Sequence, residues 1–242
     1  DTEWHAAPSL SYIPDTAKIY ADGKLVDTYT DAFDAEDEAL YAALPGVAKA
    51  ASVTDSEGNV TYYATIADAI KAAQPGDEVF IYAGEYTGDV NVNKAITVVG
   101  ETDAEGNNLV NISGKLSISG SNVTVKNLNV SNPSGSAGAI SGGNILVEGC
   151  QLTGSNGLRY CYAHNGDVTL KDCVITGGDI YGVHFDAGNG DGDVIIDGCT
   201  ITGWTSFGSA IEEVRISNTE FKDGSYDKLR FYQNAEVTNC TF

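Results

Sequence analysis

The clearest pattern in the chain is a short unit of alternating apolar and polar residues that recurs through its second half. The copies follow one another at intervals of 20 to 26 residues and begin at Asn122, Asn144, Asp167, Asp193, Glu213 and Asn234. A period of this length, filled with short alternating runs, is typical of a solenoid in which each unit contributes short strands. The pattern therefore predicts a stack of β-strand coils.

Apolar residues recur at fixed positions inside the unit. One column contains Val125, Val147, Leu170, Ile196, Ile216 and Val237, and a second contains Val130, Leu152, Ile175, Ile201, Phe221 and Phe242. Because a single unit cannot bury its own apolar face, we expect these residues to stack on their counterparts in neighbouring coils.

Four of the five cysteines occupy one further position of the unit. This column reads Leu128, Cys150, Cys173, Cys199, Thr219 and Cys240, and only Cys161 lies outside it. Disulfides or a metal site are alternatives, but neighbouring coils lie about 4.8 Å apart and in-register stacking seldom suits disulfide geometry. We interpret the column as an internal ladder of small apolar side chains.

The residues before the repeats predict a small mixed segment, residues 1–62, and then the solenoid, residues 63–242. Asp22-Gly23 lies between two alternating runs and predicts a hairpin, a helix is expected over residues 35–44, and a second hairpin is expected between residues 50–53 and 60–63. A helix follows over residues 66–73, where Thr65 and Asp68 resemble a capping box and Pro75-Gly76 ends the helix.

The stretch from Tyr63 to Gly100 resembles the N-terminal helix and first coil of the pectin lyase-like superfamily. The matching residues are Tyr63, Thr65, Ile66, Ala69, Ile70, Ala73, Pro75, Gly76, Asp77, Val79, Ile81, Gly84, Tyr86, Ile96, Val98 and Gly100. The resemblance implies an all-β fold, a right-handed parallel β-helix with an N-terminal capping helix. It leaves function open, because the superfamily includes lyases, hydrolases, phage tailspikes and non-catalytic adhesive domains of bacterial surface proteins.

Signatures of the superfamily's enzymes are missing from the sequence. There is no Asn-Thr-Asp, Asp-Asp or Gly-His-Gly as in polygalacturonase-like hydrolases, and no Arg-x-Pro-x-x-Arg as in pectate lyases. These departures favour a protein without catalysis, and a divergent lyase stays open as the alternative.

The charge of the chain restricts its partners. The 242 residues include 34 acidic and 13 basic side chains, a formal net charge of −21 at pH 7. Such a chain repels nucleic acid and anionic membrane surfaces, and no apolar run is long enough to span a membrane. The absence of Met and the end within a repeat suggest a segment of a longer exported protein with further modules, located outside the cell or at its surface.

Basic side chains gather at one position of the strand that precedes each repeat. Leu158-Arg159-Tyr160, Val183-His184-Phe185 and Leu229-Arg230-Phe231 share an apolar–polar–apolar alternation, so Arg159, His184 and Arg230 are expected on one sheet face. Tyr162, Asp186 and Tyr232 lie nearby in the sequence. Arginine binds sugar carboxylates and aromatic rings cover sugar faces, so the six residues are a candidate carbohydrate site. The alternative is a solvated face whose basic groups relieve acidic repulsion.

A second candidate site is the loop in the longest repeat. Asp186, Asn189, Asp191 and Asp193 alternate with small residues and supply oxygen ligands of the kind that Ca2+ prefers. The loop lacks the other ligands of an EF-hand, and a polar turn accounts for it equally well. No other cofactor is indicated.

Three functions are compatible with the sequence. The first is a binding module that recognises a polysaccharide or host glycan without catalysis. The second is a polysaccharide lyase or glycoside hydrolase acting on a uronate-containing glycan through the same residues. The third is a rigid spacer of a longer surface protein.

Overall fold

The computed structural model describes residues 18–21, 24–28, 49–186, 191–222 and 228–242. The chain divides into two compact units, Asp1–Lys49 and Ala50–Phe242. In the first, β1 (Lys18–Ala21) and β2 (Lys24–Thr28) pair antiparallel, with Ala21 opposite Lys24. This register confirms the predicted hairpin, whereas the helix expected over residues 35–44 lies outside the described residues.

The second unit begins with the other predicted hairpin. Strands β3 (Ala51–Thr54) and β4 (Val60–Tyr63) pair antiparallel, and β3 also pairs antiparallel with β5 (Glu78–Ile81). The hairpin thus extends a sheet of the solenoid. The domain boundary drawn after residue 62 is therefore too late, because the second compact unit starts at Ala50.

Helix α2 (Ile66–Ala72) forms where the capping box predicts it. The backbone N–H of Asp68 donates to Thr65 Oγ1 over 3.1 Å, which satisfies one of the free donors at the helix N-terminus. Ile66, Ala69 and Ile70 are buried from the same helix face, as their spacing predicts.

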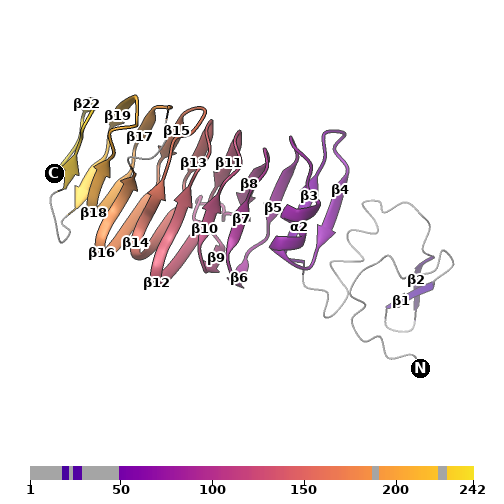
Figure 1. The fold of residues 1–242 in the computed structure, drawn as a ribbon. Coiled ribbons are helices and arrows are strands. Elements are labelled where there is room, and N and C mark those ends of the chain that lie inside the picture. The colour runs from indigo at the N-terminus through magenta and orange to yellow at the C-terminus, as the bar shows by residue number, and fades with distance from the viewer. Residues whose placement is uncertain (1–17, 22–23, 29–48, 187–190, 223–227) are drawn as a thin grey trace. The chain divides into compact units, whose positions relative to one another are not determined.

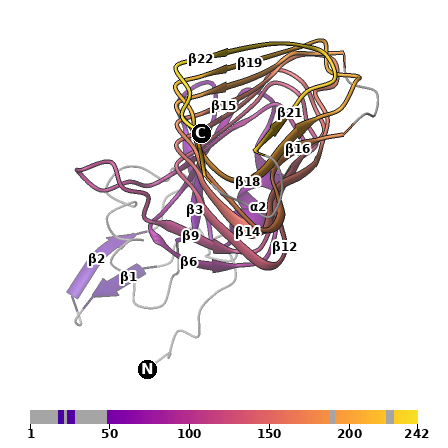
Figure 2. The same cartoon turned by 90° about the vertical axis from the view of Figure 1, so that its left-hand side faces the viewer.

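Parallel strands of two ten-stranded sheets make up the rest of the unit (Figure 1). After β5, the first sheet contains β8 (Thr97–Gly100), β11 (Val123–Lys126), β13 (Ile145–Glu148), β15 (Val168–Lys171), β17 (Val194–Asp197), β19 (Glu213–Ser217) and β22 (Asn234–Thr238). The second contains β6 (Gly84–Thr87), β7 (Val90–Val92), β9 (Val110–Ser113), β10 (Leu116–Ile118), β12 (Asn129–Ile140), β14 (Gln151–Cys161), β16 (Val174–Phe185), β18 (Thr200–Phe207), β20 (Glu220–Lys222) and β21 (Leu229–Arg230). Seen from one end, successive coils overlie one another (Figure 2).

The predicted columns are confirmed by the strand register. Val125 pairs with Val147, Val147 with Leu170, and the column continues in register to Val237. Cys150, Cys173 and Cys199 are free thiols at most 2% exposed, so the ladder is part of the core. The residue before each ladder position has a positive φ, which explains why it is always Asn, Asp or Gly in these repeats.

The long strands of the second sheet bend at a glycine and carry the candidate site on their second half. In β14 and β16, Gly154 pairs with Gly177 before the bend, and Leu158 pairs with Val183 after it. Beyond the bend, Leu158 and Val183 point into the core, so the residues that follow them face outward.

No helix among the described residues has the length and apolar character needed to cross a membrane.

Candidate functional site

The second halves of β14 and β16, together with β21, place the predicted basic residues on one outer face. His184 pairs with Ser206, and Ser206 pairs with Arg230, so these side chains occupy one outward column in register. Arg159 follows Leu158, whose partner is Val183, and therefore lies one coil before His184. The prediction that Arg159, His184 and Arg230 share a sheet face is consistent with this register.

The sequence analysis aligns Tyr160 with Phe185, and the structure shows that this alignment is wrong. Cys161, not Tyr160, pairs with Phe185, so β14 has one residue more than β16 between the two pairs. Tyr160 is that extra residue. It has a φ of 58° and is 52% exposed, whereas Cys161 is completely buried. This bulge turns the Tyr160 ring outward beside Arg159, instead of into the core.

Arg159 and Arg230 each lie over two aromatic rings. Arg159 Cζ is 4.6 Å from the centroid of the Tyr160 ring and 5.3 Å from that of Tyr181. Arg230 Cζ is 4.4 Å from the centroid of Tyr232 and 5.8 Å from that of Trp204. These are cation–π distances, and the contacts hold both guanidinium groups in defined positions.

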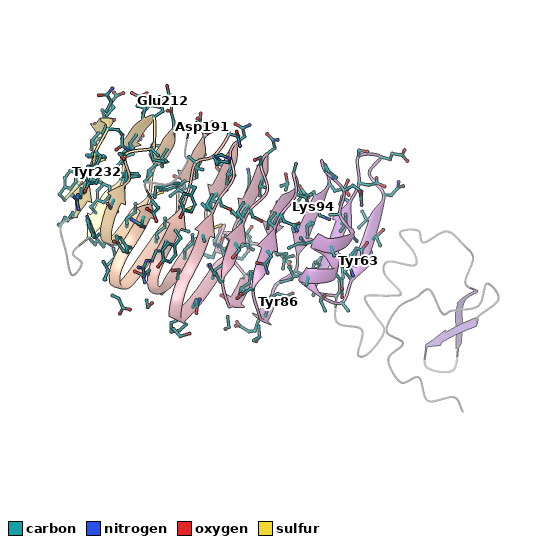
Figure 3. All side chains as sticks on the ribbon, in the orientation of Figure 1. Tyr63, Tyr86, Lys94, Asp191, Glu212 and Tyr232 are labelled. Atoms are coloured by element: carbon teal, nitrogen blue, oxygen red, sulfur yellow. The ribbon has the colours of Figure 1, made fainter. Side chains whose placement is uncertain are left out.

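The two arginine clusters are joined by a stacked pair of rings. Tyr181 and Trp204 lie opposite each other on β16 and β18, with centroids 5.0 Å apart and planes inclined by 17°. We call this continuous row the aromatic–arginine column. In order along the solenoid it contains Tyr160, Arg159, Tyr181, Trp204, Arg230 and Tyr232. Figure 3 labels Tyr232, which lies near the C-terminal end of the unit.

The other arginine of the chain has a different environment. Arg215 lies on β19 of the first sheet and forms ion pairs of 2.8 Å with Asp193 and 2.6 Å with Glu213. Within residues 49–186, 191–222 and 228–242, neither Arg159 nor Arg230 forms an ion pair with a carboxylate. Both guanidinium groups thus lack a neutralising carboxylate among the described residues, and a group of this kind can donate two hydrogen bonds to an anion.

His184 packs against the aromatic–arginine column. Its ring centroid is 4.3 Å from that of Tyr181, and its Nδ1 is buried without a hydrogen-bond partner. Burial lowers the pKa of His184, the Asp186 carboxylate opposes this change, and the Arg159 charge adds to it. His184 is therefore neutral at pH 7 and can accept a proton.

Tyr162 and Asp186 form a hydrogen-bonded pair, and the charge of Asp186 also acts on His184. Burial raises the pKa of Tyr162, and the charge of Asp186 and a hydrogen bond with its carboxylate raise it further. Tyr162 and Asp186 are partly exposed, while Tyr232 is 58% exposed. All six predicted carbohydrate-site residues thus lie on β14, β16 or β21, or within two residues after these strands. The residues of the aromatic–arginine column that the prediction omitted are Tyr160, Tyr181 and Trp204. It also omitted Ser206, which pairs with both His184 and Arg230.

The described carboxylates of the predicted Ca2+ loop have other partners. Asp191 accepts a hydrogen bond from the backbone N–H of Asn165, and Asp193 pairs with Arg215. Asn189 lies outside the described residues. No group of three or more His, Cys, Asp or Glu side chains that could hold a metal ion occurs in the described parts of the chain. The Ca2+ site stays a prediction.

Comparison with known proteins identifies the fold. No family model and no curated protein matches the chain. Two solved structures of the pectin methylesterase from Aspergillus niger match it with TM-scores of 0.51 and 20% sequence identity. The matches cover 76% and 77% of this chain and 74% of each esterase chain. The fold is a right-handed parallel β-helix like that of these esterases. At this identity the comparison shows the fold alone.

Proposed function

We propose that the protein is a binding module for an acidic polysaccharide, active outside the cell or at its surface, and that it binds through the aromatic–arginine column. The observation that carries the proposal is the pair of arginines, Arg159 and Arg230, each held against two rings and without a carboxylate partner among the described residues. A guanidinium group that is already positioned loses less entropy when it binds a uronate carboxylate with two hydrogen bonds.

The aromatic part of the column supports a sugar ligand over a small inorganic anion. Tyr160 and Tyr232 are more than half exposed, and Tyr181 and Trp204 are partly exposed between them. Aromatic rings provide rigid apolar contact area with polar O–H and N–H groups at their edges, which suits the mixed surface of a pyranose. The similar solved structures are pectin methylesterases, so de-esterified pectin is the first ligand to test.

Removal of the two arginines tests this function. Each arginine-to-carboxylate contact is worth about 1.5–3 kcal/mol, so Arg159→Ala and Arg230→Ala should each weaken binding to polygalacturonate by about tenfold or more. Isothermal titration calorimetry or affinity electrophoresis measures the change. Arg215→Ala is the matched control, because it removes the same charge from the other sheet and should leave binding unchanged.

Equal binding by the wild-type chain and both column variants would contradict the proposal. So would an equal loss in the Arg215→Ala variant, since that result would indicate a general charge effect. Circular dichroism of each variant establishes that the β-helix is retained.

A second candidate function is a uronate lyase, favoured by the environment of His184. A neutral imidazole beside Arg159 could remove the proton next to a sugar carboxylate whose charge the guanidinium neutralises. Incubation with polygalacturonate, followed by the ultraviolet absorbance of unsaturated chain ends, distinguishes a lyase from a binding module. Product that forms with the wild-type chain and not with His184→Gln would establish the lyase, and binding without product would establish the module.

A further inference from the structure

The aromatic–arginine column repeats one chemical group at two equivalent places. Arg159 directly follows Leu158, and Arg230 directly follows Leu229. Leu158, Val183, Thr205 and Leu229 form one in-register inward column, so the two arginines leave the sheet from corresponding positions of different coils. Each guanidinium also has an exposed tyrosine at the outer end of the row, Tyr160 or Tyr232.

The coils that contain β16 and β18 lie between the two arginines. The position equivalent to the arginines has no permanent charge on either coil. It is occupied by His184, whose pKa is lowered, and by Ser206, which is 6% exposed. The stacked rings of Tyr181 and Trp204 fill the space along the row between the two guanidinium groups. The outer face therefore presents a cation, an uncharged aromatic section and a second cation.

The spacing of the two cations follows from the strand pairing. Three strand steps lead from β14 to β16, to β18 and to β21, and each step is about 4.8 Å, so the arginines leave the sheet roughly 14 Å apart. One sugar carboxylate is too small to contact both guanidinium groups. A chain that contacts both has to run along the solenoid, across the strands.

We infer that the column is a bivalent site for a linear polyanionic glycan, in which Arg159 and Arg230 bind two separate carboxylates of one chain that lies parallel to the solenoid axis. This inference rests on the proposed function and adds the orientation, the number of charged contacts and the minimum length of the ligand. Once one carboxylate is bound, the second contact is intramolecular and has a high effective concentration. Affinity therefore increases abruptly at the length that reaches both arginines.

A length series of oligogalacturonates tests the bivalent site. With the wild-type chain, calorimetry should show weak binding of short oligomers and an increase of at least about tenfold in affinity once the extended oligomer spans about 14 Å. Arg159→Ala and Arg230→Ala should each bind the short oligomers within a factor of about two of the wild type, and neither should show the increase.

Two further comparisons distinguish a bivalent site from a general effect of protein charge or of oligomer length. Arg215→Ala should keep the abrupt increase, and neutral oligomers of the same lengths should show none. A wild-type affinity that rises only gradually with length, while both column variants still weaken polymer binding, would overturn the bivalent site and leave the proposed function intact. Absence of binding at every length, polymer included, would overturn both.

Discussion

His184 shows at the scale of one residue how packing in the column changes chemistry. Tyr181 lies against its ring, Arg159 lies on the preceding coil, Ser206 pairs with it from the next, and Asp186 is two residues further along the chain. Burial has the largest effect on its pKa and lowers it from 6.5, because the charged imidazolium loses hydration; Asp186 opposes and Arg159 reinforces this change. The folded chain therefore holds the proton of His184 less tightly than the unfolded chain does.

The sign of this pKa change predicts an effect of pH on stability. Between the lowered pKa of the folded state and 6.5, the unfolded chain binds more protons at His184, so this residue makes the free energy of unfolding fall as pH decreases through that window. His184→Gln removes this contribution. We expect the loss of thermal stability between about pH 7.5 and about pH 5 to be smaller for His184→Gln than for the wild type, as measured by circular dichroism.

His164→Gln is the control for this comparison, because His164 is exposed and lies outside the aromatic–arginine column. It should lose stability over the same pH range as the wild type does. A wild-type chain that loses no more stability than His184→Gln would show that burial does not lower the pKa of His184.

At the scale of the elements, the sequence predicts those strands whose residues repeat with a fixed spacing. The columns of Val125 and Val130 and the cysteine ladder were predictable because every coil uses the same inward positions. Strands β9 and β10 were not predicted, because their coil precedes the first recognisable copy at Asn122. Their alternating runs, Val110–Ser113 and Leu116–Ile118, contain the signal that could have found them.

The candidate site was predicted less completely because it depends on where the register changes. The extra residue Tyr160 in β14 breaks the alignment with β16. In the pairing of β16 with β18 the register shifts twice, between Thr176 and Tyr181 and between Tyr181 and Val183. A fixed repeat therefore places Tyr181 and Trp204 at unrelated positions, although they stack in the structure. An aromatic residue soon after the bend glycine in consecutive repeats, such as Trp204 after Gly203, is a signal that could reveal such a row.

The antiparallel start of the first sheet could not be derived from local sequence. The turn between β3 and β4 predicts a hairpin but does not specify its neighbour, because the pairing of β3 with β5 joins segments separated by helix α2. The boundary between the units was misplaced for this reason. Long-range pairing of this kind depends on packing against α2 and on the free edge of β5, which no periodic pattern expresses.

For the whole molecule, the formal net charge of −21 opposes the positive charge of the column. Under the proposed function, the chain as a whole repels an anionic glycan at long range, and Arg159 and Arg230 attract it at short range. Added salt screens the first interaction more than the second, because the Debye length falls from about 30 Å at 0.01 M to about 8 Å at 0.15 M ionic strength. Binding by this chain should therefore respond to salt differently from binding by a basic protein.

This difference predicts that the association rate constant for polygalacturonate increases when salt is raised from about 0.01 M to about 0.15 M, since screening removes the long-range repulsion that slows the encounter. The dissociation rate should increase only slightly over the same range, because the bound carboxylates contact the guanidinium groups directly. Surface plasmon resonance with immobilised glycan measures both rates.

Arg215→Ala should show the same salt dependence, as its charge lies on the other sheet. An association rate that decreases steadily with salt would mean that attraction dominates the encounter, which would require a basic surface that extends well beyond the aromatic–arginine column.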